Sequence, residues 1–404
     1  MIPFAEKSSR FLARLLAVGV LLLGLVTIAH SDVIRVPADF ATIQAGIDAA
    51  ANGDTVSVAD GEYNVNNLTI QNKSISLVSE NGNQNTKIDG SGSHRLLTIN
   101  NPSSLGTTRV IGFNFRHGKG SAVINCTDGN VTFEQVIVEN SGYNTGGSLI
   151  VGSGIDETFF IGCIVRNNTQ ENYPGINGAT VVRCLFYGNS AWNNSTNIIG
   201  CKVINSTIVN NPGGGWVYPV VGGGSEVINS IIWNNGGSSN FNSHATISYS
   251  LLPSSSPQVG ANGNISGDPK LDGSFALASV SPCIDSGSPD SKYNDLDGTR
   301  NDIGAFYFHS NQAPAFSESN ATFTVVENNA SASFVVTATD PDANTTLVYA
   351  KSGPDADKFD LNVATGTLTF INTPDFEANA SAAGNNAFSL TITVTDGEAN
   401  ATQA

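Results

Sequence analysis

Acidic residues in the C-terminal quarter of the chain are grouped close to the ends of predicted strands. Asp340 with Asp342 and Asp375 with Glu377 form two short motifs, while Glu327 and Asp396 stand alone. Carboxylates brought together at one end of a β-sandwich repel one another unless a cation neutralises them, and hard oxygen ligands favour Ca²⁺. The pattern predicts calcium binding; the alternative is six acidic residues on solvated turns.

Alternating strands must position these carboxylates. From Pro314 onward, polar and apolar residues alternate in segments that turn signals separate, which is typical of a β-sandwich. The predicted strands are residues 323–326, 333–339, 347–349, 367–370 and 388–394. A change in composition at residues 310–313 marks a linker between this segment and the rest of the chain.

Upstream, the stretch from Val131 to Asn235 repeats one short sequence five times. The copies begin at Val136, Cys163, Cys184, Ser206 and Ser230, and each ends in Asn or Gly. Their spacing, roughly 21 to 28 residues, is typical of a solenoid. It predicts a right-handed parallel β-helix, since few hairpin signals support an antiparallel sandwich.

Stacking the copies predicts three columns of residues along one face of the strands. Their members are mostly β-branched, aromatic or small, which suits the inside of a narrow coil. The columns are Glu134, Ile161, Val182, Ile204 and Ile228; then Val136, Cys163, Cys184, Ser206 and Ser230; then Val138, Val165, Phe186, Ile208 and Ile232. Asn at the bends predicts an internal amide ladder, with exposed turns as the alternative.

Composition and charge narrow the class of protein. The 404 residues suffice for two or three domains, and 13% charged residues with 42 Gly indicate strands and turns. The net charge of −16 excludes a basic nucleic-acid footprint. Of the five cysteines, Cys163 and Cys184 lie in adjacent coils; a disulfide is possible there, but buried free thiols are favoured.

The N-terminus has the pattern of a secretory signal peptide over residues 1–31. Lys7, Arg10 and Arg14 precede an apolar run that ends in small residues, so the mature chain is expected to start at Asp32. An uncleaved anchor is the alternative. Either outcome predicts a secreted or cell-surface protein.

A strand, an amphipathic helix and a second strand are predicted over residues 34–61, with the helix capping the open end of the solenoid. This opening is the run IRVPADFATIQAGIDAAANGDTVSVADGEYN. It resembles the start of bacterial secreted proteins with the pectin-lyase-like right-handed β-helix, and the resemblance covers most of residues 32–309.

The segment from Gly267 to Phe308 resembles the closing segment of the same secreted β-helix proteins. It carries Asp285, Asp290, Asp295, Asp297 and Asp302. A calcium-stiffened loop is one interpretation. A capping loop whose carboxylates bond the local backbone is the favoured one.

Folds of this kind often carry polysaccharide lyases, hydrolases or epimerases, whose catalytic residues would lie on the coils. A lyase needs a base and a cation that stabilises the sugar carboxylate, and a hydrolase needs paired carboxylates. The candidates are Arg116, His117, Lys119, Glu134, Glu139, Asp156, Glu157, Arg166 and Arg183. Without a recognisable signature, ordinary exposed residues are favoured.

Aromatic residues on the coils offer a second route to a carbohydrate, by stacking on sugar rings. These residues are Phe159, Tyr187, Trp192, Trp216, Tyr218 and Trp233. Trp233 is expected to point outward, in the column of Glu139.

Residues 314–404 resemble a cadherin repeat that is incomplete at its C-terminus. The motifs VVEN, ATDPDA, TGTLTF, PDFE and LTITVTDG occur in the family's order. The resemblance implies that Glu327, Asp375 and Glu377 serve a calcium site at the C-terminal junction. It assigns Asp340, Asp342 and Asp396 to the N-terminal junction, although residues 310–313 contain no acidic residue.

The expected fold is all-β, a right-handed parallel β-helix followed by a Greek-key, cadherin-like sandwich. The expected function is a secreted, calcium-binding adhesion or structural protein and not an enzyme, with proteins or polysaccharide as partners and no nucleic acid. The alternative is a polysaccharide lyase or epimerase with an accessory cadherin repeat.

Overall fold

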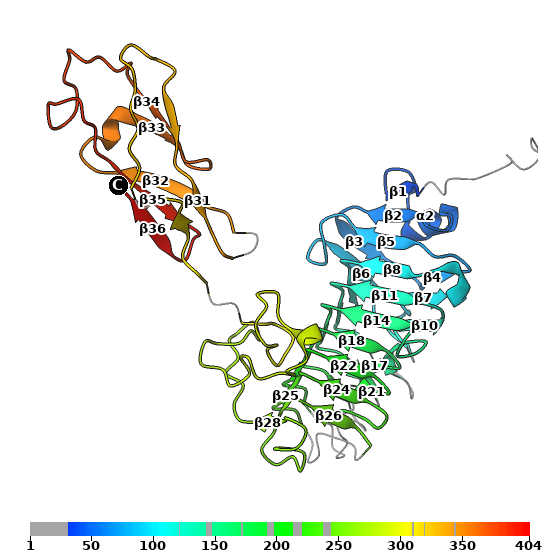
Figure 1. Cartoon of the computed structure of the whole chain (residues 1–404). Coiled ribbons are helices and arrows are strands. Elements are labelled where there is room, and N and C mark those ends of the chain that lie inside the picture. Colours follow the sequence, from blue (N-terminus) through cyan, green and yellow to red (C-terminus); the bar gives the residue numbers. More distant parts are fainter. Residues whose placement is uncertain are drawn as a thin grey trace, which may run out of the picture. The chain divides into compact units, whose positions relative to one another are not determined.

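The chain forms two compact units, residues 1–308 and 309–404, which Figure 1 traces in the colours of the sequence. The computed structural model describes residues 31–120, 122–142, 148–170, 173–191, 198–212, 220–236, 244–308, 311–318, 320–342 and 345–404. The predicted signal peptide lies outside these ranges except for Ser31. Within them, no helix is long and apolar enough to cross a membrane.

Parallel pairing between successive coils builds the first unit, as the repeat predicts. The first sheet is β1 (Val33–Val36), β2 (Thr55–Val58), β5 (Ser76–Ser79), β8 (Thr108–Ile111), β11 (Val131–Glu134), β14 (Thr158–Ile161), β18 (Thr180–Val182), β22 (Lys202–Ile204), β24 (Glu226–Ile228) and β26 (Thr246–Ser248). The second is β3 (Gly61–Asn64), β6 (Thr86–Asp89), β9 (Asn114–Arg116), β12 (Ile137–Glu139), β15 (Ile164–Arg166), β19 (Leu185–Tyr187), β23 (Thr207–Val209), β25 (Ile231–Trp233), β27 (Leu251–Leu252) and β28 (Ile265–Ser266).

A shorter third sheet completes the coils. It contains β4 (Leu68–Gln71), β7 (Leu97–Asn100), β10 (Ile124–Asp128), β13 (Ser148–Val151), β17 (Tyr173–Asn177) and β21 (Ile198–Ile199), and a small pair joins β16 (Thr169–Gln170) to β20 (Ser190–Ala191). The unit is therefore a parallel β-helix, whose strands stack coil over coil in Figure 1.

Left-handed residues turn the chain between the first and second sheets. At this bend in four successive coils, φ is 51° for Gln135, 60° for Gly162, 52° for Arg183 and 46° for Asn205. This bend interrupts the in–out alternation, so the predicted column from Glu134 to Ile228 faces outward and its inward placement was wrong; Ile161, for example, is 40% exposed.

The other two predicted columns are buried, because they follow the bend and resume the alternation inside the coil. The column of Val136 and the column of Val138 both lie in the core of the first unit. Aromatic rings also stack from coil to coil, with the centroids of Phe133 and Phe160 4.5 Å apart.

An internal amide ladder is present, but it runs through the polar residue that follows each bend; the bend residues themselves, such as Asn167 and Asn210, are exposed. Asn168 donates to Asn189, Asn189 to Asn211 and Asn211 to Asn235, with Nδ2–Oδ1 distances of 2.9, 3.0 and 2.9 Å. Each Oδ1 also accepts the backbone amide of the coil before it. The ladder ties consecutive coils together inside the core.

The five cysteines are free and buried, which confirms free thiols over a disulfide. The thiol of Cys184 accepts the backbone amide of Cys163 at 3.3 Å, a role that Ser206 fills for Cys184 in the next coil. Burial raises the pKa of Cys126 and of Cys283 to about 12, so these thiols are poor nucleophiles.

Helix α2 (Ile43–Ala49) covers the N-terminal end of the coils as predicted. Thr42 caps it, accepting the amide of Ala45, and Ile43 and Ile47 are buried. Its Gln44 side chain exchanges two hydrogen bonds with the backbone of Thr69 in β4, at 3.1 and 2.8 Å. A helix side chain thus satisfies the edge of the third sheet.

The closing segment, residues 267–308, packs on the outer face of the second sheet. Its Leu277, Cys283 and Ile303 form a small core with Ile231 and Leu251. The amide of Ala305 donates to Thr207 Oγ1 at 2.9 Å. This segment covers the C-terminal strands of the second sheet; on the earlier strands, the side chains of Arg116 and Arg166 are partly exposed.

The aspartates of the closing segment bond local backbone, as the favoured interpretation states. Asp302 accepts the amides of Asp285 and Phe308, at 2.7 and 2.5 Å, and Asp295 accepts the amide of Asp302 at 2.7 Å. Among the described residues, no metal-sized group of ligand atoms includes them.

The buried carboxyl of Asp302 makes the closing segment sensitive to pH. Burial, with the charges of Asp295 and Asp285, raises its pKa to about 6. Its stabilising contribution is complete below the unfolded pKa near 4 and is lost as pH rises through 6. Compared with Asp302→Asn, the wild type should lose on the order of 2 kcal/mol between pH 4 and 6.5. Denaturant unfolding of both proteins across this range measures that difference; a constant offset would contradict it.

The second unit is antiparallel. Its small sheets are β29 (Ala315–Phe316) with β31 (Ala338–Thr339); β30 (Ser333–Val335), β34 (Thr367–Phe370) and β33 (Phe359–Asn362); and β32 (Val348–Ser352), β35 (Thr391–Thr395) and β36 (Asn400–Gln403). Val336, Tyr349, Phe359, Leu368, Ile392 and Val394 form its core. The cadherin-like topology stays a prediction.

The strand predicted at residues 333–339 is divided between β30 and β31, which pair in different sheets. Two other predicted strands of this unit also differ from the structure. Residues 323–326 join no ladder, and the strand expected at 388–394 begins only at Thr391. Both segments alternate as strands do, but the described residues provide no neighbouring strand with which their backbones can pair.

Candidate functional site

An outward-facing row of polar residues crosses the N-terminal part of the second sheet. Parallel register places one residue of each strand beside the next, from β3 to β19. The row is Asn64, Asp89, Arg116, Glu139, Arg166 and Tyr187. Neighbouring strands lie about 4.8 Å apart, so charges of opposite sign alternate at contact distance along the coils.

Asp89 joins the two basic residues of the third coil. Its Oδ2 lies 3.0 Å from Arg116 Nε and 2.8 Å from His117 Nδ1, while its Oδ1 accepts the amide of Ser91 at 2.7 Å. Arg116 also reaches Glu62, 2.6 Å away. The carboxylate of Asp89 is nearly buried, whereas the imidazole of His117 is 45% exposed. Asp89 can therefore orient an imidazole that solvent reaches.

His117 occupies a bend that asparagine usually fills. It has φ of 51°, and the equivalent bends of later coils hold Asn140, Asn167 and Asn210, all with positive φ. Asparagine is the usual non-glycine residue in this conformation. A histidine there places an imidazole at the end of the row without changing the course of the coil.

A second cluster continues the row toward the C-terminus. Arg166 donates to Glu139 at 2.6 Å and to the hydroxyl of Tyr187 at 3.0 Å. Asn114 donates to the other oxygen of Glu139 at 2.7 Å, but its own Oδ1 is buried without a hydrogen bond among the described residues. Such an unsatisfied acceptor costs about 1–3 kcal/mol.

Contacts with neighbouring residues keep the carboxylates of Asp89 and Glu139 ionised. Burial alone would raise the pKa of Asp89, but hydrogen bonds from Ser91, His117 and Arg116, with the charge of His117, lower it overall. Burial would likewise raise the pKa of Glu139, but hydrogen bonds from Asn114 and Arg166 lower it overall. Both carboxylates are therefore charged at neutral pH.

The closing segment bounds the row. The ring of Phe275 lies 4.7 Å from that of Tyr187, and Trp233, which does point outward, packs partly buried against the closing segment. Trp233 is therefore an anchor for that segment, and the expected sugar-stacking role does not fit it. Trp192, Trp216 and Tyr218 lie outside the described residues.

Only some of the catalytic candidates from the sequence belong to the row. Arg116, His117, Glu139 and Arg166 belong to the row. Glu134 pairs instead with Arg109 on the first sheet, at 2.7 Å, and Arg183 lies at a bend near the ring of Tyr307. Sequence reasoning missed Asp89, Glu62 and Asn114; the shared register of Asp89 with Arg116 was the signal that would have found Asp89.

Three of the acidic residues in the second unit come together. Glu327, Asp375 and Glu377 are exposed, and one oxygen of each lies within 4.8 Å of the others, close enough to hold a metal ion. The amide of Phe376 donates to Glu327 at 3.3 Å and links the two chain segments. The resemblance assigned these three residues to one site, and calcium binding there stays a prediction.

The other three predicted ligands do not form such a group in the described part of the chain. Asp342 accepts the amide of Gln312 at 2.7 Å, and Asp396 accepts the side chain of Asn311 at 2.9 Å. Asp340 accepts the amide of Asp342. Linker backbone and amide groups thus contact the predicted N-terminal site.

No protein-family profile and no curated protein matches the sequence. Solved structures do match. The pectate lyase Pel9A is 14% identical over 70% of this chain and 98% of its own, with a TM-score of 0.35. The pectin methylesterase of Aspergillus niger in deglycosylated form is 13% identical over 59% and 83%, at 0.31, and the PL6 family alginate lyase AlyGC is 16% identical over 55% and 41%, at 0.26.

These matches correct one expectation. The chain was expected not to be an enzyme, but the solved structures named above are those of lyases and an esterase, and that expectation is withdrawn. At such low TM-scores the likeness identifies no reaction and no residue. A reaction can therefore be inferred only from the residues of the row.

Proposed function

We propose that the first unit is a polysaccharide-active enzyme that removes a proton from an acidic sugar. The observation that carries this proposal is the contact of Asp89 with Arg116 and with the exposed imidazole of His117. An exposed imidazole oriented by a carboxylate is suited to general base catalysis. A neighbouring guanidinium is suited to a sugar carboxylate.

The roles follow from the positions of the groups. With Nδ1–H donated to Asp89, Nε2 of His117 is free to accept the proton next to the uronate carboxylate. Arg116 and Arg166 stand two strands apart, roughly 10 Å, and stabilise negative charge on the substrate. In elimination the bond to the leaving glycosidic oxygen breaks as the ring double bond forms, and solvent protonates that oxygen. In epimerisation a proton returns to the opposite face.

Absorbance assays test the proposal on the full chain. Pectate, alginate and chondroitin are incubated with the protein, with and without calcium, and the unsaturated product of elimination is followed in the ultraviolet. Exchange of the sugar proton with deuterated water reports epimerisation. If no unsaturated product and no proton exchange are detected on any of the three polymers, both reactions are excluded for these substrates.

The second unit is proposed as an accessory, calcium-binding, cadherin-like module. The support is the clustering of Glu327, Asp375 and Glu377, which fits oxygen coordination of Ca²⁺. Asp340, Asp342 and Asp396 are proposed to form the second site, completed in part by groups of the linker. The signal-like N-terminus supports export to the cell surface or the medium, where calcium is abundant and adhesion to proteins is a further role for the module.

Calcium is expected to bind saturably and to stabilise only the second unit. At a calcium concentration one hundred times the dissociation constant, the gain is about 2.7 kcal/mol. Calorimetric titration and thermal unfolding of the full chain measure both effects. Glu327→Gln with Glu377→Gln should abolish binding at this site, whereas Asp357→Asn, in an exposed ion pair with Lys358, should not. Unchanged binding in the double variant would contradict the assignment.

A further inference from the structure

The outward side of the first sheet is exposed along the six strands from β8 to β24. The side chains of Arg109 on β8 and Glu226 on β24 are 48% and 47% exposed, and Ile161 on β14 is exposed as well. The closing segment packs on the second sheet instead. The outward positions of these six strands are called the β8–β24 face.

Parallel register arranges the β8–β24 face in two columns. Most positions in the first column are aliphatic, and the second column is mixed. The first column is Ile111, Glu134, Ile161, Val182, Ile204 and Ile228; the second is Arg109, Thr132, Phe159, Thr180, Lys202 and Glu226. On the two middle strands, β14 and β18, neither column carries a charge. The face therefore has an apolar centre between charged ends.

The four charged residues of the face form two ion pairs. Arg109 on β8 pairs with Glu134 on β11 at 2.7 Å, and Lys202 on β22 pairs with Glu226 on β24 at 3.3 Å. From β8 to β24 the strands are thus positive, negative, neutral, neutral, positive and negative. In the reverse direction the order is the same with every sign inverted. Such a face is complementary in charge to a second copy of itself that runs in the opposite direction.

We propose that two copies of the chain pair through the β8–β24 face, about a two-fold axis that lies along the strands between β14 and β18. This axis reverses the order of the coils and keeps each column opposite itself. Arg109 of one copy then faces Glu226 of the other. Lys202 lies opposite β11 of the other copy, where Glu134 is the acidic residue. Both copies use the same residues, as a two-fold interface requires.

Apolar contacts fill the centre of this interface. Ile161 meets Val182 of the other copy in the first column, because the two residues are equally far from the axis. Burying such side chains between two sheets is favourable. The charges fix the register: a copy displaced by one strand would bring Arg109 opposite Lys202, or Glu134 opposite Glu226, and like charges oppose both arrangements.

The charge pattern favours a second copy over an acidic polymer. Each cation of the face has a carboxylate beside it, so a polyanion would meet both signs at each end and gain little. The face is small, and the dimer is therefore expected to be weak and to form at high protein concentration. The inference is independent of the proposed enzymatic function, since the row lies on the second sheet.

Sedimentation equilibrium of the full chain tests the proposal, at concentrations up to about 1 mM. The wild type should pass from monomer to dimer as the concentration rises. Arg109→Glu brings two carboxylates together at each facing contact, and Glu226→Arg brings two guanidinium groups together. Because each change occurs twice in the interface, either variant should pair with itself at least about tenfold more weakly. A wild type that stays monomeric, or variants that dimerise as it does, would overturn the proposal.

An equimolar mixture of the two variants separates the charge contact from misfolding. In a mixed dimer the introduced carboxylate faces the introduced guanidinium group at one contact, and the native Arg109 faces the native Glu226 at the other. The mixture should therefore dimerise about as tightly as the wild type. If two variants with native circular dichroism stay monomeric when mixed, Arg109 and Glu226 do not face each other.

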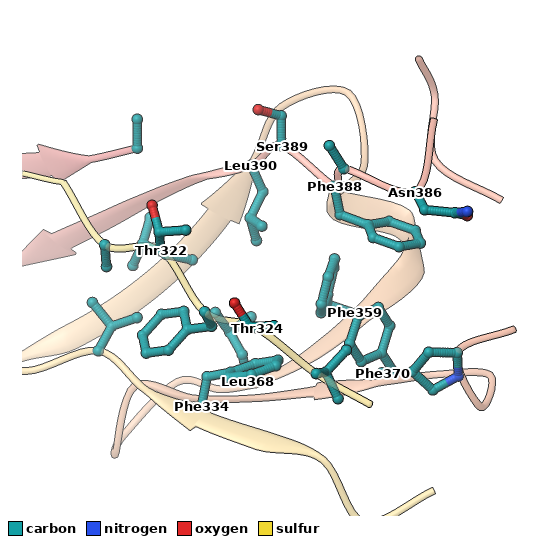
Figure 2. Close-up of a pocket in the computed structure, with 18 of the residues that line it drawn as sticks. Thr322, Thr324, Phe334, Phe359, Leu368, Phe370, Asn386, Phe388, Ser389 and Leu390 are labelled. Atoms are coloured by element: carbon teal, nitrogen blue, oxygen red, sulfur yellow. The ribbon is translucent and has the colours of Figure 1, made fainter. Parts of the chain in front are cut away.

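Exposed apolar residues of the second unit supply the control for unspecific association. Phe376 is 66% exposed and lines a pocket of that unit, whose apolar side chains Figure 2 shows. Ile161→Ser, at the centre of the β8–β24 face, should weaken the dimer at least about fivefold. Phe376→Ser should leave the dimer unchanged. Equal weakening by the two changes would mean general hydrophobic association and would refute the proposed face.

Discussion

Replacing His117 with asparagine should lower the rate of polyuronate cleavage by a factor of about 10² to 10⁴, the usual contribution of a general base. Asparagine is chosen because the equivalent bends of other coils hold it in the same left-handed conformation. Its amide can still donate to Asp89. The variant therefore removes proton abstraction while preserving the fold and the contact.

The role of the positive charge of Arg166 is tested separately from the role of His117 as the base. Arg166→Ala leaves Glu139 without its ion pair and removes a cation near the substrate, so KM should rise and kcat should fall. Arg109→Ala is the matched control, since Arg109 pairs with Glu134 on the first sheet in a similar contact. Full activity in His117→Asn would refute the proposed base, and equal losses in the two arginine variants would point to general destabilisation.

The repeat allowed much of the first unit to be predicted, since each coil must bury the same columns to stack on its neighbour. The period, the Asn ladder and the capping helix follow from that requirement. The outward column of Glu134 was misplaced because the left-handed residue Gln135 resets the alternation, and Gln gives no signal for this conformation. Glycine or asparagine at the same bend in other coils was the available clue.

The row was only partly predictable, because it depends on register between coils outside the clearest repeats. Arg116 and His117 were identified as a basic group, but Asp89 lies 27 residues earlier than Arg116 and precedes a coil of different length. The sequence positions alone therefore did not predict that the carboxylate of Asp89 contacts the imidazole of His117. The proximity of Glu327 to Asp375 and Glu377 was expected from the order of the motifs, and calcium binding by this group stays a proposal.

Replacing Asn189 with alanine should destabilise the first unit by about 3–5 kcal/mol. Asn189 is 1% exposed. Its Oδ1 accepts the amide of Asn168, and its Nδ2 donates to Val165 O at 2.8 Å and to Asn211. Alanine leaves several buried groups unpaired, at about 1–3 kcal/mol each.

Denaturant unfolding, followed for each unit separately, measures the loss. Asn189→Ser should recover part of it, because serine fills the same ladder position at Ser141, whose Oγ accepts the amide of Gly118 at 2.9 Å. Asn234→Gly is the control: it removes an exposed rung to Asn210 and keeps the left-handed bend, so it should change stability by less than about 0.5 kcal/mol. A loss below about 1 kcal/mol in Asn189→Ala would mean that the apolar columns hold the coils together and that the ladder only sets their register.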